Sequence, residues 1–234
     1  MGKAPEENHY TFKYHFLLGD GIELSQSVIV DKETLISAIN TPTPFPEWTA
    51  LEFNQCSHCT LKNSAHCPIA IRLIEPLALF NPYISYNKVT VTVTTDERTY
   101  SKKTDLQDGI RSLFGLIMAT SSCPSMEPFR PMARFHLPFS TIDETVYRVT
   151  SMYLLSEFFL HEEESHIPFN MENLFSLYDI IQNVNMGIIQ RLRAVAEKDS
   201  TLNAVNILDS YAALVPMYIQ KKLDQLKILF AENK

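Results

Sequence analysis

Four cysteines are the residues of this chain whose type and spacing best fit a chemical role. Cys56 and Cys59 form a Cys-x2-Cys pair and Cys67 follows after seven residues. The distant Cys123 stands directly before a proline, as Cys67 does. A Cys-x2-Cys turn places two thiolates on one side of a tight loop, and zinc takes four such ligands in a tetrahedron. We therefore expect one metal site with these four cysteines as ligands and zinc as the metal.

Other outcomes for the same cysteines stay open. The two Cys-Pro pairs make an iron–sulfur cluster the alternative cofactor, and a redox or disulfide arrangement or unlinked buried thiols are further alternatives. His58 or His66 could replace one thiolate, although four cysteines already complete a closed site and we interpret both histidines as solvated loop residues. A site closed by four thiolates has no position for water, so it would be structural and not hydrolytic.

A second candidate site lies in the proline-rich stretch 129–138, where Arg130, Arg134 and His136 alternate with apolar residues. Arginine side chains offer forked donors for a carboxylate or phosphate, and a histidine can act as acid or base. The alternative interpretation is that these side chains satisfy carbonyl groups and fasten an irregular linker to the rest of the chain.

A third group of polar residues falls on one face of a predicted helix. Asp199, Asn203 and Asn206 are spaced at i, i+4 and i+7, and Asn185 and Arg191 of the preceding helix could approach them. Such a seam could line a ligand pocket between helices, but more often the groups cap helix ends and satisfy one another.

The elements that position the cysteines begin with strands. Apolar residues alternate with polar ones over residues 10–16, and a Gly-Asp-Gly turn leads to a return strand over residues 22–30. Val89 to Thr94 and residues 98–101 predict a second hairpin. Residues 48–53, which lead to Cys56, are a candidate further strand.

One helix is predicted to follow Cys67, and another is predicted to end shortly before Cys123. Pro68 can be the first residue of a helix whose N-cap is Cys67, where the thiolate would face unpaired backbone N–H groups. Thr104 and Gln107 fit a capping box for a helix that ends near Thr120, shortly before Cys123.

Prolines at 128, 131 and 138 predict an irregular segment over residues 126–139. Thr141 and Glu144 then fit a capping box, and three long helices are expected over residues 141–163, 170–198 and 201–230. Pro216 should kink the last one. The predicted fold class is α+β: an antiparallel sheet of two hairpins with two helices, joined to a C-terminal three-helix antiparallel bundle. Residues 1–125 would form the α+β domain, 126–140 a linker and 141–234 the bundle, packed as one unit.

Composition limits the class of protein. The chain has 234 residues, of which 45% are hydrophobic, so it can bury a substantial core. A formal net charge of -7 argues against nucleic acid or an anionic membrane as partner, because both require a basic face. No apolar run is long enough for a membrane span or a signal core, which predicts a cytoplasmic protein whose thiols stay reduced.

The pattern Cys-x2-Cys-x7-Cys-Pro, the later Cys-Pro at 123–124 and Arg-Pro-Met-Ala-Arg-Phe-His-Leu-Pro-Phe at 130–139 resemble an uncharacterised bacterial family of unknown function. The similarity covers the first hairpin through the last helix. The resemblance implies a cytoplasmic bacterial protein in which these segments belong together, and it transfers no catalytic roles.

The leading functional prediction is a metal-stabilised binding or regulatory module with a structural four-cysteine site. The alternative is an enzyme acting on an anionic small molecule, with Arg130 and Arg134 as anion binders and His136 as acid or base. A third hypothesis is a thiol or iron–sulfur redox sensor. The expected partner is an unknown protein or an anionic small molecule.

Overall fold

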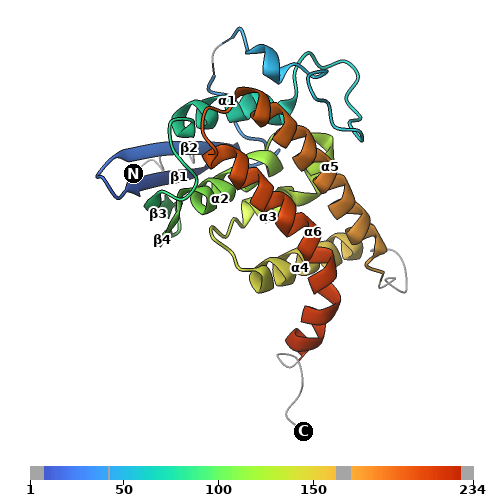
Figure 1. The fold of residues 1–234 in the computed structure, drawn as a ribbon. Helices are drawn as coiled ribbons and strands as arrows, with labels where there is room; N and C mark the ends of the chain where they lie inside the picture. The colour runs from blue at the N-terminus through green and yellow to red at the C-terminus, as the bar shows by residue number, and fades with distance from the viewer. Residues whose placement is uncertain (1–7, 42, 162–169, 228–234) are drawn as a thin grey trace, which may run out of the picture.

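The computed structural model describes residues 8–41, 43–161 and 170–227 (Figure 1). The strands of this described part are β1 (His9–Leu18), β2 (Glu23–Asp31), β3 (Lys88–Thr94) and β4 (Thr99–Asp105). Its α-helices are α1 (Pro68–Phe80), α2 (Leu106–Ala119), α3 (Arg130–Arg134), α4 (Ile142–Leu160), α5 (Glu172–Val195) and α6 (Ser200–Leu226). Two 3-10 helices are η1 (Glu47–Thr49) and η2 (Pro124–Phe129). The fold is therefore mixed, with both α and β elements, as predicted.

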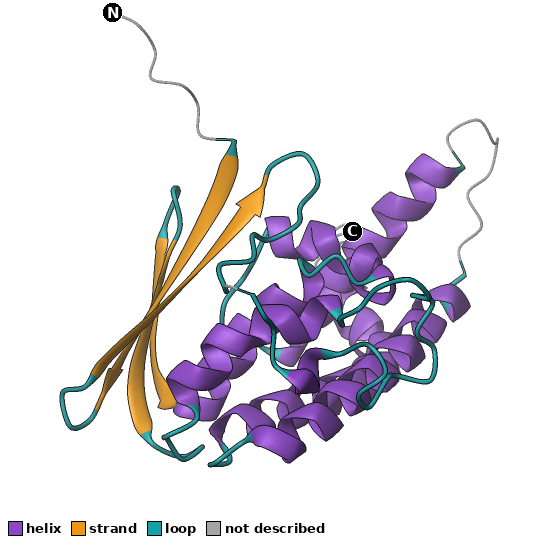
Figure 2. Cartoon of the chain, turned by 90° about the horizontal axis from the view of Figure 1, so that it is seen from above, coloured by secondary structure: helices purple, strands orange, loops and turns teal. Residues whose placement is uncertain are grey.

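The four strands form one antiparallel sheet in the order β2-β1-β3-β4. Successive side chains of a strand point to opposite faces, so every second residue of β1 and β3 faces the helices, and these residues are apolar. Figure 2 shows the sheet at one side of the molecule, with the helices packed on a single face of it. The inward-facing side chains that are completely or almost completely buried include Tyr14, Phe16, Val91 and Val93.

Helix α2 lies directly on this buried face of the sheet. A Cβ atom at Gly109 would come within 2.7 Å of Val91 Cγ2 and 2.8 Å of Phe16 Cε1, so glycine permits the close approach. On its other side α2 contacts α6, which also packs against α5 and α4. One hydrophobic core therefore includes residues of the sheet, of α1 and α2, and of the C-terminal helices.

One of the two predicted capping boxes is present and the other is not. Thr141 and Glu144 form the predicted capping box at the start of α4. The capping box at Thr104 does not form, because Thr104 pairs with Val89 in the ladder and β4 continues through Asp105, the N-cap of α2. The Thr104 hydroxyl donates to the carboxylate of Asp108 instead.

One predicted strand and one predicted irregular segment are also corrected. Residues 48–53 are not a strand but the end of η1 followed by turns. Residues 126–139 are not irregular throughout, since they contain most of η2 and all of α3. Pro131 lies in the first turn of α3, where a helix needs no backbone donor. The predicted ends of the helices at 163 and 230 lie outside the described residues.

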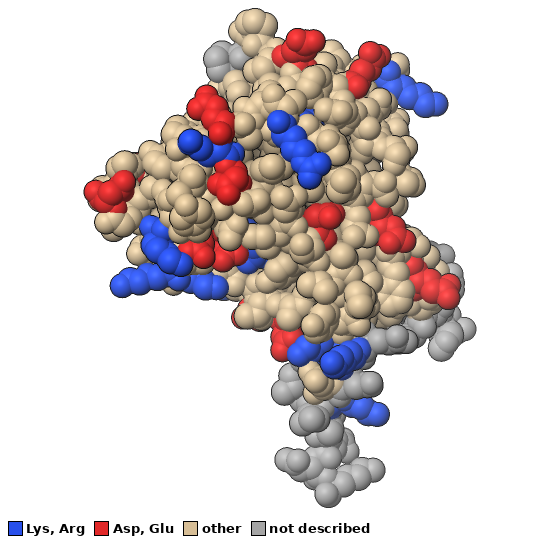
Figure 3. Space-filling view, in the orientation of Figure 1, with Lys and Arg blue, Asp and Glu red and all other residues tan. Residues whose placement is uncertain are grey.

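None of the described helices is long and apolar enough to cross a membrane. On the face shown in Figure 3, lysine and arginine side chains are interspersed with aspartate and glutamate, and no continuous basic surface is visible there.

Candidate functional site

The four cysteines, which come from three separate parts of the chain, line one small cavity of about 20 Å³. Cys56, Cys59 and Cys67 are half-buried, Cys123 is buried, and all four are free thiols. Residues of α5 close the cavity on the remaining side. The structure thus brings together all four cysteines that the spacing singled out.

The loop that carries Cys56 and Cys59, which we call the cysteine loop (residues 51–66), is closed at its base by the backbone. The Cys67 amide donates to the Thr49 carbonyl over 2.8 Å, and the Leu51 amide donates to the Ala65 carbonyl over 3.0 Å. Within the loop, the Cys59 amide donates to the Cys56 carbonyl over 3.0 Å and forms the expected tight turn. In Figure 1 the loop lies beside the start of α1 and the middle of α5.

Cys67 and Cys123 occupy the same local position in two different elements. Each is the N-cap of a helical segment whose first residue is proline: Cys67 for α1, as predicted, and Cys123 for η2. Ser122 has a φ of 65°, which turns the chain sharply between the end of α2 and Cys123. The Cys123 sulfur also lies within hydrogen-bonding reach of the backbone amides of Ser125 and Met126.

Arg191 of α5 holds the start of the cysteine loop. Its Nη1 donates to the carbonyls of Trp48 and Ala50 over 2.6 and 2.8 Å, and its Nη2 donates to the Leu51 carbonyl over 2.9 Å. The Arg191 residue is only 2% exposed. Because three cysteine thiols lie close enough to interact with its charge, a buried cation stands beside the cavity.

Arg72 of α1 joins the two N-cap cysteines indirectly. Its Nη1 donates to the Pro68 carbonyl over 3.1 Å and to the Ser121 carbonyl over 2.8 Å, so it fastens the residues that flank Cys67 and Cys123 to each other. This contact connects segments that are about 50 residues apart in the chain.

Gly187 of α5 lets the cysteine loop approach the helix. A Cβ atom at this position would come within 3.1 Å of the Cys56 Cβ atom and 3.4 Å of the Asn54 carbonyl oxygen. Burial raises the pKa of the Cys56 thiol, and the nearby thiols of Cys59 and Cys123 raise it further. Burial also raises the pKa of Cys123. Without a cation beside them, Cys56 and Cys123 therefore favour the neutral thiol form.

As the side chains of the described residues stand, no group of three or more His, Cys, Asp or Glu is arranged so that it could hold a metal ion. The thiols surround a common cavity, and a metal would have to draw them together.

The two candidate histidines make other contacts. His58 is exposed and its Nδ1 lies 3.1 Å from the Ser57 hydroxyl. His66 Nδ1 lies 2.9 Å from the Thr49 hydroxyl, and its ring contacts Phe45 edge to face. Neither histidine lines the cavity of the cysteines.

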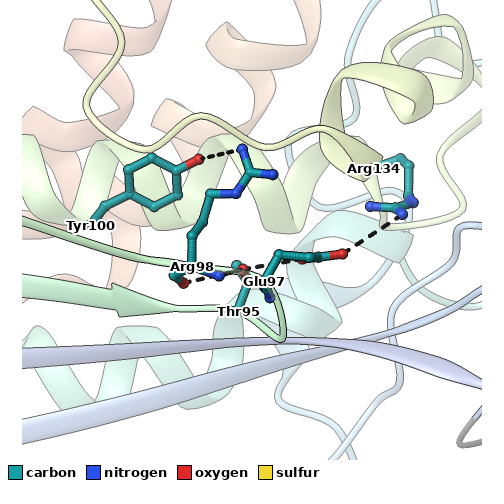
Figure 4. Close-up of polar contacts among 5 residues, drawn as sticks. All are labelled: Thr95, Glu97, Arg98, Tyr100 and Arg134. Atoms are coloured by element: carbon teal, nitrogen blue, oxygen red, sulfur yellow. Dashed lines mark hydrogen bonds and ion pairs between the residues drawn. The ribbon is translucent and has the colours of Figure 1, made fainter.

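Of the second candidate group, Arg134 and His136 line one outer cleft, whereas Arg130 does not. Arg130 Nη1 donates to the Glu127 carboxylate over 3.0 Å. The Arg134 guanidinium lies 3.8 Å from the centre of the Tyr10 ring, and Figure 4 shows it pointing to Glu97, which is 3.9 Å away. The Arg130 and Arg134 guanidinium groups are thus held by other side chains of the fold, as expected for a linker fastened to the rest of the chain.

His136 points inward to the sheet. Its Nε2 lies 2.5 Å from the Tyr14 hydroxyl, which is also 3.1 Å from the Ser112 hydroxyl. Burial lowers the pKa of His136 to about 3, and the Arg148 charge lowers it as well. The imidazole is therefore neutral at physiological pH and serves as a buried hydrogen-bonding group.

The predicted polar seam forms only in part. Both carboxylate oxygens of Asp199 accept hydrogen bonds from Ser85, and Asn203 donates to Asp199 over 3.0 Å. Arg191 lies elsewhere, beside the cysteines. These groups satisfy one another, as the alternative interpretation held.

Sequence reasoning did not assign the half-buried Arg72 or the buried Arg111 to any site, and it placed Arg191 with the polar seam. A usable signal exists for Arg191. It falls three residues after Ile188 and four before Val195, on the apolar stripe of its helix, where a charge must find buried partners.

Searches of the curated proteins and of the solved structures give no significant match. The family model described as Domain of unknown function (DUF6901) matches residues 11–231, which is nearly the whole chain. The predicted resemblance to an uncharacterised family is confirmed at this level, and the chain belongs to the DUF6901 family.

Proposed function

We propose that this chain is a metal-stabilised binding or regulatory module in which Cys56, Cys59, Cys67 and Cys123 hold one zinc ion. The observation that carries the proposal is the shared cavity: cysteines from a loop, a helix start and a second helical start all line it. Unlinked buried thiols have no reason to converge from segments this far apart. A metal bound there would fasten the cysteine loop, α1 and η2 to one another.

The charge around the cavity fits a thiolate site. Four thiolates on a divalent zinc carry a net charge of about −2, which is unfavourable in a buried place without a counter-charge. Arg191 supplies a buried positive charge close to three of the cysteines. Its guanidinium is already fixed by three backbone carbonyls, so it needs no rearrangement to act as the counter-charge.

At the N-cap position of Cys123, the backbone amides of Ser125 and Met126 lower the pKa of its thiol and so oppose the larger effect of burial. Unpaired backbone N–H groups at a helix start stabilise a nearby negative charge. With all four positions filled by sulfur, the zinc would have no site for water, so its role would be structural. An iron–sulfur cluster is the alternative occupant of the same thiolates.

Metal analysis of protein purified without chelator tests the proposal. We expect colourless protein with about one zinc per chain. Brown protein that contains iron would show that the thiolates hold an iron–sulfur cluster instead of zinc. Folded protein without metal, in which all four thiols react readily with a thiol reagent, would refute the site.

Two variants sharpen this experiment. Cys123→Ser should lose the zinc, because three thiolates from one short segment do not close the tetrahedron. Thr60→Ser, an exposed change inside the cysteine loop, should keep the zinc and serves as the matched control. Removing zinc from the unaltered protein should lower Tm by roughly 10 °C, since a loss of a few kcal/mol shifts Tm by about 2–4 °C per kcal/mol at this length.

A further inference from the structure

A second and larger cavity of about 190 Å³ lies between α2, α5, α6 and the segment that contains η2 and α3. Its walls are mainly apolar and include Met126, Phe129, Met132 and Val215. Methionine side chains adapt their shape to different apolar occupants. A cavity of about 150 Å³ holds one benzene ring, so this one would accept an apolar body of about six to eight carbons.

Two polar side chains line the cavity with donor atoms that have no hydrogen-bond partner. Arg111 Nε and Asn185 Nδ2 are both buried and unpaired, and the residues are only 9% and 1% exposed. The nearest carboxylate to Arg111 Nε is that of Asp108, at 3.7 Å, which is beyond hydrogen-bonding distance. Leaving a buried donor unpaired is unfavourable, so the Arg111 donor points to an occupant that can accept from it. The Asn185 amide has the Asp209 carboxylate beside it.

The charge of the lining is positive. Arg111 and Arg148 both line the cavity, whereas its described lining contains no aspartate or glutamate. Asp209 of α6 does not line the cavity, but its carboxylate interacts with the Asn185 side chain, and its Oδ1 atom is also buried without a hydrogen-bond partner. Arg111 is also held in place by the Tyr211 ring, whose centre is 4.5 Å from the guanidinium carbon. A fixed cation in an apolar cavity favours an anionic group attached to an apolar body.

A second, more polar cleft of about 290 Å³ adjoins the inner cavity. It lies between the start of β1, the β3–β4 turn and the segment 134–137. Arg98 and Arg134, which are labelled in Figure 4, line this outer cleft. His136, Leu137 and Arg148 line both cavities, so they form the wall between them.

We propose that the inner cavity binds a small monocarboxylate with an apolar body of about six to eight carbons. The carboxylate accepts a hydrogen bond from Arg111 Nε, and the body lies among the methionine and aromatic side chains. The inference goes beyond the metal site. No cysteine lines this cavity, so an experiment can refute the carboxylate site without refuting the metal site, and the reverse.

Calorimetric titration with octanoate, with octan-1-ol as a neutral match and butyrate as a short match, tests this inference. Octanoate should bind more tightly than either. Arg111→Met should weaken octanoate binding by about ten- to hundred-fold, the usual effect of losing a charge-assisted hydrogen bond, and leave octan-1-ol binding unchanged. Arg193→Met, an exposed change on α5, should alter neither ligand.

Ala212→Phe would fill the inner cavity and should abolish binding of both octanoate and octan-1-ol. Equal affinity of the unaltered protein for octanoate and octan-1-ol would overturn the carboxylate assignment, and absence of octanoate binding would overturn the site. If the Arg111→Met variant does not fold, the Arg111 Nε–H resonance of the unaltered protein gives the answer. It should shift on addition of octanoate, and an unchanged resonance at saturation would refute the contact.

Discussion

Replacing Arg191 by methionine tests whether this side chain fixes the cysteine loop. The change removes all three hydrogen bonds to the carbonyls of Trp48, Ala50 and Leu51 and keeps most of the apolar stem. A buried carbonyl that loses its donor destabilises the fold by about 1–3 kcal/mol. Two of the three contacts are buried and one is partly buried, so we expect a total loss of roughly 3–5 kcal/mol.

Urea denaturation followed by circular dichroism measures this loss. With an m value of about 2–3 kcal/mol/M, the midpoint should fall by about 1–2 M. Arg193→Met, two residues further along the same helix and exposed, is the matched control. It should cost less than about 1 kcal/mol, the usual contribution of an exposed cation near a helix C-terminus. If Arg191→Met is no more destabilising than Arg193→Met, Arg191 does not fix the loop and our account of the site is wrong.

Two further predictions concern the buried face of the sheet. The pKa of His136 is lowered to about 3 in the folded protein, below its ordinary value of about 6.5. The unfolded chain therefore takes up the proton first and stability falls as pH drops from 6.5 towards 3. His136→Gln, measured by urea denaturation at pH 7 and pH 5, should remove about 1–2 kcal/mol of that fall. Replacing each of the two glycines of α2 by alanine should change the free energy of unfolding in opposite directions. Gly115→Ala should stabilise by about 0.5–1 kcal/mol through helix propensity, because a Cβ there meets only Leu208 at 3.6 Å. Gly109→Ala should destabilise by about 1–2 kcal/mol because its Cβ would collide with Val91.

Each of these has a clear contrary result. A stability difference between the unaltered protein and His136→Gln that is the same at both pH values would show that His136 does not resist protonation. Equal effects of the two glycine substitutions would show that α2 does not approach the sheet as closely as described.

The strands and most helices could be predicted because their signals are local. Alternation in β1 and β3, the proline after Cys67 and the capping box at Thr141 each reflect interactions within a few residues. The error at Thr104 has a physical cause. Thr104 remained extended because its partner Val89 lies on another strand, and a pairing of that kind is not visible in the local pattern. The strand order, with β1 and β3 at the centre, was not predictable for the same reason.

The candidate site shows the same limit. Cysteine spacing was sufficient to group Cys56, Cys59, Cys67 and Cys123, which line one cavity in the structure. The linker residues were grouped by sequence proximity alone, and the side chains of Arg134 and His136 take different partners. The cavity beside Arg111 could not be predicted, because its walls come from α2, the segment 126–140, α4, α5 and α6, whose contacts depend on the whole fold.

The sheet order has a consequence for how the chain folds. The two central strands are not neighbours in the sequence, and pairing Leu18 with Val89 closes a loop of about 70 residues. Contacts of such long range slow folding, because the entropy of closing the loop is lost before the pairing stabilises the chain. The cysteine loop lies inside this segment. A cross-link within it would shorten the effective length of chain to be closed, so the cysteines would act on the rate of folding as well as on the stability of the folded protein.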